Sequence, residues 1–147
     1  MMKMYFLFLK WLSCALTLTC LTLFVWGTFF ETPYLSYQNL PFTSLQPIVL
    51  AGSAATFSVA RCNKSDKEIL YTTSRNLRNV TTGVVTLLPD INLSLPLNCT
   101  RAISKINEIP ESEKSGNYVA FGTAKVPGRF RTYDVRWNTE PFIVVGK

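Results

Sequence analysis

The stretch that decides the fold is Ile91–Asn98, I-N-L-S-L-P-L-N. Its apolar residues occupy every second position, and they are Ile91, Leu93, Leu95 and Leu97. Because successive side chains of a strand point to opposite faces, this period of two predicts a half-buried β-strand. Pro96 has no backbone N–H to donate, so the strand is expected to lie at the edge of its sheet.

Alternation of this kind recurs before and after the stretch. The strands that it predicts are Pro47–Ala51, Ala55–Cys62, Ile69–Leu77, Val84–Leu88, Tyr118–Val126, Phe130–Trp137 and Phe142–Val145. Pro89-Asp90 predicts a break before Ile91, and Ala102–Ile106 is ambiguous. Short strands spaced by about 8–12 residues are typical of a β-sandwich of immunoglobulin-like size. We therefore predict an all-β domain over residues 48–147, with the fold of an antiparallel immunoglobulin-like β-sandwich.

An apolar segment precedes this domain. Trp11–Phe30, W-L-S-C-A-L-T-L-T-C-L-T-L-F-V-W-G-T-F-F, contains no charged residue. A helix of that length rises about 30 Å, the thickness of the hydrocarbon core of a bilayer. Lys3 and Lys10 lie before the segment, and no lysine or arginine follows it until Arg61. The positive-inside rule therefore predicts a cytoplasmic N-terminus and an exported C-terminal domain.

The chain is thus expected to be a single-pass membrane protein. Its predicted parts are a cytoplasmic N-terminus (1–10), a transmembrane helix (11–30), an extended juxtamembrane tether (31–47) and the exported domain (48–147). The prolines of the tether argue against a helix there. The alternative to an anchor is a signal peptide cleaved after Gly27, although bulky aromatic residues crowd that position.

Two features are expected to tie the domain together. Cys62 ends an early strand and Cys99 ends a middle one, and an exported domain favours a disulfide between them. This bond would close a loop of about 37 residues and contribute about 3–4 kcal/mol in the chain-entropy model, while two free buried thiols are the alternative. Tyr118 begins a late strand, where its hydroxyl can hydrogen-bond a loop carbonyl or its ring can simply fill the core.

The composition argues against catalysis and against nucleic-acid binding. The chain has no histidine, the commonest general base and zinc ligand. It also lacks a phosphate-binding loop, a nucleophile motif and a cysteine-rich metal cluster, so we predict no enzyme activity, no metal, no cofactor and no small-molecule substrate. Two of the 15 lysines and arginines precede the apolar segment, so the rest of the chain contains 13 basic and 9 acidic residues. These charges are scattered, which favours solubility over a nucleic-acid site.

Two sets of residues are candidate sites. N-glycosylation sequons begin at Asn63, Asn79, Asn92 and Asn98. They are acceptors only in a eukaryotic secretory pathway, and such triplets also arise by chance in turns. The segment Val126–Phe142 interleaves arginines with aromatic residues, a composition typical of protein interfaces. Its candidate partner-binding residues are Arg129, Arg131, Tyr133, Arg136 and Trp137. In the alternative that we favour, these aromatic residues pack the core and the arginines pair with acidic residues.

Several pieces of the chain carry a resemblance. They are Ala51-Gly52, Arg61-Cys62-Asn63, Asn79–Pro89 (N-V-T-T-G-V-V-T-L-L-P), Gly116-Asn117-Tyr118 and Val126–Phe142. In these pieces the chain resembles small membrane proteins encoded by tailed bacteriophages, which have an N-terminal hydrophobic segment and an all-β domain. The resemblance implies a bacterial inner membrane with the domain in the periplasm, and it weakens the glycosylation interpretation.

These observations together lead to an expected role. We expect a phage-encoded accessory protein that is anchored in the lipid bilayer and binds an envelope protein through its exported domain. One alternative is a lysis-control protein of the holin or antiholin type, whose function would lie in the apolar segment itself. The other is a glycosylated surface protein of a eukaryotic virus.

Overall fold

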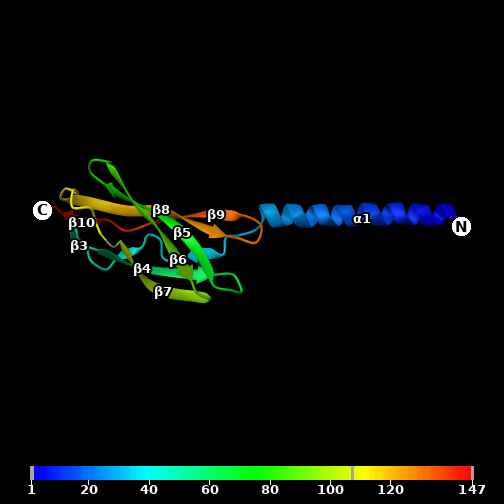
Figure 1. The fold of residues 1–147 in the computed structure, drawn as a ribbon, viewed down its shortest axis with the longest axis horizontal. Coiled ribbons are helices and arrows are strands. Elements are labelled where there is room, and N and C mark those ends of the chain that lie inside the picture. The colour runs from blue at the N-terminus through cyan, green and yellow to red at the C-terminus, as the bar shows by residue number, and fades with distance from the viewer. Residues whose placement is uncertain (1, 107, 147) are drawn as a thin grey trace. The chain divides into compact units, whose positions relative to one another are not determined.

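The computed structural model describes residues 2–106 and 108–146, and it shows one helix followed by strands (Figure 1). The chain forms two compact units. The first contains the residues up to Thr32 together with Gly128–Arg131, and the second contains Pro33–Pro127 together with the residues from Thr132 onward. The second unit holds all the strands and is called the β domain.

The helix α1 runs from Met2 to Phe29. Between Met4 and Phe29 it is long and apolar enough to cross a membrane, as judged from length and composition. Its threonine hydroxyls donate hydrogen bonds of 2.7–2.8 Å to carbonyl oxygens four residues earlier, at Thr17, Thr19, Thr22 and Thr28. These hydroxyls therefore need no water, which suits an apolar environment. The helix begins before the predicted Trp11 because the preceding residues include no glycine or proline.

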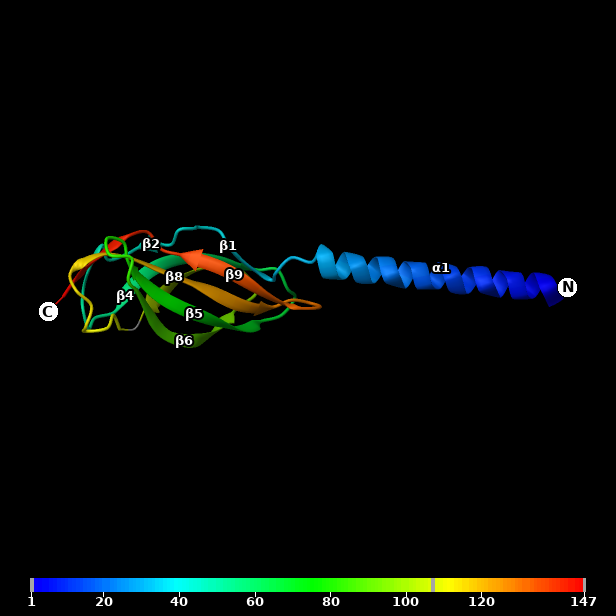
Figure 2. The ribbon, with the colours of Figure 1, turned by 90° about the horizontal axis from the view of Figure 1, so that it is seen from above.

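The β domain contains ten strands in the described part of the chain. They are β1 (Leu35–Tyr37), β2 (Thr43–Ser44), β3 (Ile48–Leu50), β4 (Ala55–Asn63), β5 (Ile69–Asn79), β6 (Val85–Leu95), β7 (Asn98–Ile106), β8 (Gly116–Pro127), β9 (Thr132–Asn138) and β10 (Phe142–Val145). In the first sheet, β1 and β2 pair with one edge of β4 and β7 pairs with the other. In the second sheet the order is β3-β10-β8-β5-β6, and β9 also pairs with β8. Figure 2 shows β6, β5, β8 and β9 side by side.

The predicted alternation places the core between the two sheets. On β5 the buried residues are Ile69, Tyr71, Thr73, Arg75, Leu77 and Asn79, with half-buried or exposed residues between them. Phe57 of β4 meets Phe142 of β10 edge-on, with ring centroids 5.4 Å apart. The prediction of a domain built mainly of strands is therefore confirmed. The arrangement is not purely antiparallel, because β3 pairs with β10 in parallel.

Strand β6 differs from the prediction in two ways. It runs continuously through Pro89-Asp90, and it ends at Leu95, so Leu97 lies in the turn to β7. The proline is accommodated because Pro89 and Asp90 together oppose the single residue Ser74 in a β-bulge, a position where a strand tolerates proline. The expectation that this strand lies at an edge is confirmed, since β6 ends the strand order of its sheet.

The segment assigned to a tether contributes to the first sheet. Leu35 and Phe42 are buried, and β1 and β2 pair with β4. Phe42 also joins the two sheets, because its N–H donates to the Asn138 carbonyl at 2.8 Å and its carbonyl accepts from the Glu140 N–H at 2.9 Å. One side of the β domain is thereby closed by backbone hydrogen bonds. The opposite side is bordered by β6 and β7, which belong to different sheets.

The two predicted ties are both present. Cys62 and Cys99 form a disulfide and are directly opposed residues of the neighbouring strands β4 and β7. The bond therefore joins two strands of one sheet and does not connect the two sheets. The Tyr118 hydroxyl lies 2.9 Å from the Lys114 carbonyl oxygen and 2.9 Å from Glu113 Oε2. The hydroxyl of Tyr118 therefore holds the loop before β8 in place, while the tyrosine ring is buried in the core.

Candidate functional site

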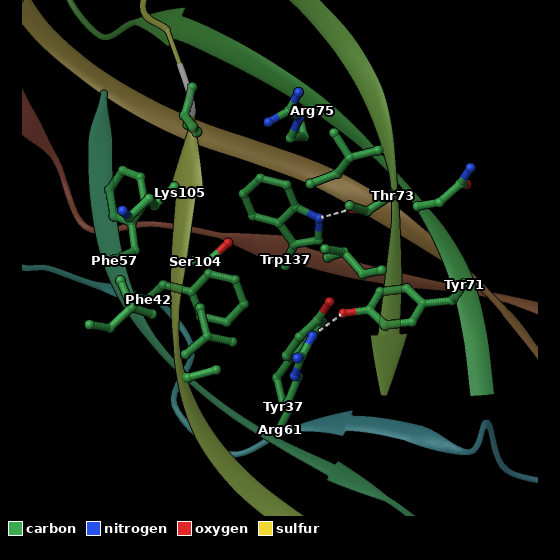
Figure 3. Close-up of a pocket in the computed structure, with 17 residues that line it drawn as sticks. Tyr37, Phe42, Phe57, Arg61, Tyr71, Thr73, Arg75, Ser104, Lys105 and Trp137 are labelled. Carbon is green, nitrogen blue, oxygen red and sulfur yellow. Dashed lines mark hydrogen bonds between the residues drawn. The ribbon is translucent and has the colours of Figure 1, made fainter. Parts of the chain in front are cut away.

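A cavity of about 420 Å³ lies between the two sheets, on the side bordered by β6 and β7 (Figure 3). A turn connects β6 to β7, but the two strands pair in different sheets: β6 pairs with β5, and β7 pairs with β4. The two strands are therefore the edges of an opening between the sheets. The volume falls in the range of about 300–1,000 Å³ that is usual for small-molecule pockets.

Small side chains on β7 leave this space unfilled. Ala102 and Ser104 line the cavity from β7, and they pair with Val59 and Phe57 of β4. Across the cavity, Ile91 and Leu93 of β6 form an apolar wall. A larger residue at Ala102 or Ser104 would fill space that is now open, since protein interiors are otherwise closely packed.

The indole of Trp137 lines the cavity midway between Arg75 at one end and Tyr37 and Arg61 at the other (Figure 3). Its Nε1–H donates to Thr73 Oγ1 at 2.9 Å, and its ring stacks on Phe42 with centroids 5.7 Å apart and an interplanar angle of 13°. Only 9 % of the side chain is exposed. The hydrogen bond and the stacking together hold the indole in one orientation and offer a flat apolar surface to the cavity.

A guanidinium group that is not fully paired lines one end of the cavity. Arg75 is only 8 % exposed, and its Nε and Nη2 both donate to the Pro89 carbonyl, at 2.9 and 2.7 Å. Its Nη1 is buried and has no hydrogen-bond partner among residues 2–106 and 108–146. Burial lowers the pKa of Arg75, while the negative charge of Asp90 acts in the opposite direction. A buried donor without an acceptor is costly, so this arrangement is unusual unless a ligand completes it.

A second polar group lies on the other side of Trp137 (Figure 3). Arg61 Nη1 donates to the Tyr71 hydroxyl at 2.8 Å, and the buried Nε of Arg61 has no partner within the described ranges. Tyr37 also lines this end. Burial raises the pKa of Tyr37, interaction with Tyr71 raises it further, and the charge of Arg61 opposes the rise. The cavity therefore has an apolar middle with hydrogen-bonding groups at both ends.

The two raised tyrosine pKa values predict how stability depends on pH. Burial is the main cause of the rise for Tyr118 as it is for Tyr37. In the unfolded chain both tyrosines ionise at about pH 10, whereas the folded domain retains both protons there. The unfolded state then binds fewer protons, so the free energy of unfolding is expected to fall as the pH rises above about 10. Denaturant titrations at increasing pH measure this fall, and it should be smaller in the Tyr37→Phe/Tyr118→Phe variant. An equal fall in both proteins would contradict the assignment.

Replacing Arg75 by methionine is expected to raise the free energy of unfolding of the empty domain by about 1 kcal/mol. The substitution removes a buried charge with an unsatisfied nitrogen and keeps most of the apolar volume. The Pro89 carbonyl loses two hydrogen bonds, but Pro89 is exposed and water can replace them. Chemical denaturation measures the change. A loss of more than about 2 kcal/mol would show that Arg75 is retained for stability.

The predicted partner-binding residues are divided between the two units. Arg129 and Arg131 belong to the first unit, and the other three residues belong to the β domain. On β9, Arg136 is exposed and Tyr133 is half-buried, whereas Trp137 faces the cavity. The core position of Trp137 agrees with the alternative that we favour from the sequence. A protein interface through the remaining residues stays a prediction.

The four sequon asparagines differ in accessibility. Asn63 and Asn79 are both 8 % exposed. The Asn63 side-chain nitrogen donates to the carbonyls of Lys67 and Leu95, and Asn79 Oδ1 accepts from two backbone N–H groups of the following turn. Asn92 and Asn98 are exposed. Of the four, these two therefore lie at surface positions of the folded domain, and Asn92 Oδ1 accepts a hydrogen bond of 2.7 Å from the Thr72 hydroxyl.

Comparison with solved structures finds proteins of low sequence identity with a partly similar fold. No protein-family model and no curated protein sequence matches this chain. A CARDB domain from Pyrococcus furiosus, solved with two metal ions, is similar with a TM-score of 0.47 and 17% identity, over 80% of this chain and 98% of that one. An alkylpurine DNA glycosylase from Pseudomonas fluorescens bound to abasic-site DNA is similar with a TM-score of 0.46 and 10% identity, over 84% of this chain. The chain spans about a third of that glycosylase, since the match covers 33% of it.

Proposed function

We propose that this chain is a single-pass membrane protein whose exported immunoglobulin-like β domain acts by binding, and not by catalysis. In this proposal the N-terminus is cytoplasmic, and the protein is a phage-encoded accessory factor at the envelope of its bacterial host. The observation that carries the binding role is the cavity between the sheets, which is lined by Arg75, whose buried Nη1 has no partner among the described residues. A pocket with an apolar middle and a few polar groups that can fix a ligand is typical of a binding site.

Two further observations support the location. Helix α1 is long and apolar enough to span a bilayer, and Lys3 and Lys10 both lie in its N-terminal part. The disulfide between Cys62 and Cys99 is of the kind that persists outside the cytoplasm. The bacteriophage setting rests on the resemblance of sequence pieces alone.

Cysteine labelling tests the topology. In a Cys14→Ser/Cys20→Ser background, Ser112→Cys places a thiol in an exposed loop of the β domain, and Met2→Cys places one at the first residue of the helix, before the apolar stretch Met4–Phe29. A membrane-impermeant maleimide applied to intact spheroplasts should label the first variant, and it should label the second only after lysis. The reverse pattern would overturn the proposal. Mass spectrometry of the membrane fraction should find the intact 16.6 kDa chain, whereas a shorter chain that begins after Gly27 would contradict an anchor.

A further inference from the structure

We propose that the cavity binds an amphiphile, a molecule with one alkyl chain and an anionic headgroup, and that Arg75 binds the headgroup. This inference rests on the binding role proposed above and assigns a ligand class to the same cavity.

The headgroup is inferred from the state of Arg75. The side chain is more than nine-tenths buried, and the hydrogen bonds of its Nε and Nη2 both go to one carbonyl. In the part of the chain that the structure describes, the two N–H groups on Nη1 have no acceptor. A carboxylate or phosphate oxygen would accept from them in a charge-assisted hydrogen bond, which is stronger than a bond to a neutral group. Such a ligand would also neutralise a charge that the fold otherwise keeps buried.

The sign of the headgroup charge follows from the lining as a whole. Among the described residues, the side chains around the cavity include the cations Arg61, Arg75 and Lys105 and no aspartate or glutamate. Asp90 influences Arg75 from outside this lining, since it is an exposed residue of the bulge. A cationic ligand would therefore be repelled by the cations of the lining, and a neutral hydrogen-bond acceptor would pair with Nη1 without neutralising its charge.

The alkyl chain is inferred from the middle of the cavity. The fixed indole of Trp137 forms one apolar surface, and Ile91 and Leu93 form another. A small inorganic anion would bind Arg75 and leave this apolar surface exposed to water. An alkyl chain would cover it, at roughly 25 cal/mol for each Å² of apolar surface removed from water.

The length and entry of the ligand follow from the strands. Tyr71 and Arg75 lie four residues apart on β5, and this spacing corresponds to about 13 Å along the strand. An extended chain with its headgroup at Arg75 would therefore pass Trp137 and reach the group formed by Arg61 and Tyr71 (Figure 3). It can enter between β6 and β7, because these edge strands pair with neighbours in different sheets.

Trp137 can report directly on occupancy. The chain has three tryptophans, so Trp11→Phe/Trp26→Phe leaves Trp137 as the single fluorophore of the full-length protein. The probe is 6-bromoundecanoate, with the protein held in nanodiscs. Bromine quenches an indole only on contact, and the middle of a chain whose headgroup lies at Arg75 would lie beside Trp137 (Figure 3). The neutral comparison is 6-bromoundecanol, which partitions into lipid at least as well. We expect the acid to quench saturably, with half-quenching at a concentration at least tenfold below that of the alcohol.

Matched variants identify the cation that is responsible. Arg75→Met should abolish the tenfold preference for the acid. Arg78→Met removes an exposed cation of the same strand and should retain the preference. Thermal unfolding of both variants verifies that they are folded. A third probe, 6-bromoundecyl phosphate, separates the two sources of an anionic head, because the tighter of the two anions identifies a phosphate or a carboxylate ligand.

Equal quenching by acid and alcohol in the parent protein would overturn the inference, as would an equal loss of preference in Arg75→Met and Arg78→Met. Either result would leave the membrane topology unaffected, because the labelling experiment measures it independently. An inverted topology combined with a retained preference for the acid would overturn the proposed exported location and leave the ligand assignment standing.

Discussion

Replacing Gly122 by alanine is expected to destabilise the β domain by more than about 4 kcal/mol, the largest effect that we predict for any single substitution. Gly122 lies in the middle of β8, opposite Arg75 of β5 and Trp137 of β9. A Cβ atom at this position would lie 1.9 Å from the Ser74 carbonyl oxygen and 2.7 Å from Trp137 Cζ2. The first contact is with the backbone of a paired strand, so no side-chain rotation can relieve it.

This substitution would also change the structure around the cavity. Ser74 is the residue opposite the β6 bulge, whose Pro89 carbonyl accepts the hydrogen bonds of Arg75. Moving Ser74 away from a new Cβ would disturb the bulge, and moving Trp137 would break its stacking on Phe42. Gly122 therefore allows β5, β8 and β9 to approach closely enough to form this side of the cavity.

Gly83→Ala is the matched control for Gly122→Ala. Gly83 has a φ of +73°, but a Cβ added there would meet no atom within 4 Å, so alanine costs only backbone strain of about 1 kcal/mol. Denaturant unfolding followed by Trp137 fluorescence in the Trp11→Phe/Trp26→Phe background compares the two. Equal stabilities of the two variants would contradict the close packing at Gly122.

The strands can be predicted from the sequence because alternation is a local property. The predicted strands Ile69–Leu77 and Tyr118–Val126 lie within two residues of β5 and β8 at each end. The parallel pairing of β3 with β10 cannot be predicted in this way, because it joins segments at opposite ends of the domain. Nor can the bulge at Pro89, since a proline in a sequence gives the same signal for a break and for a bulge. The strands β1 and β2 are too short to show a period.

Most of the candidate site does not follow from the sequence, although one signal for it is present. In an alternating strand, Arg75 lies an even number of positions from Tyr71 and Leu77, so all three are expected on the same face. Arg61 is related in the same way to Phe57 and Val59. A charged residue on the buried face of a strand is unusual, and it is the pattern that indicates the site. The composition instead draws attention to the arginines near Trp137, and the structure shows that this tryptophan belongs to the cavity. The cavity itself depends on the distance between two sheets, which no local pattern encodes.

Loss of the disulfide is the second large effect that we expect. The bond between Cys62 and Cys99 closes a loop of 37 residues, so its removal should lower the free energy of unfolding by about 4 kcal/mol in the chain-entropy model. The bond also anchors β7, an edge strand whose only ladder is with β4 in the described part of the chain. Cys99 lies at the start of β7, next to the turn from which β6 and β7 enter different sheets.

This position predicts a local effect that precedes global unfolding. Without the bond, β7 is held to β4 by backbone hydrogen bonds and by the side chains that face the cavity, and these include the small residues Ala102 and Ser104. In the Cys62→Ala/Cys99→Ala variant, amide hydrogen exchange should therefore increase more on β7 than on the central strand β5. Cys14→Ser/Cys20→Ser removes the exposed helix thiols and should leave both exchange and unfolding of the β domain unchanged. Equally faster exchange on β5 and β7 would show instead that the disulfide stabilises the domain only through its unfolded state. The disulfide would then have no specific role in holding β7, the strand that lines the cavity.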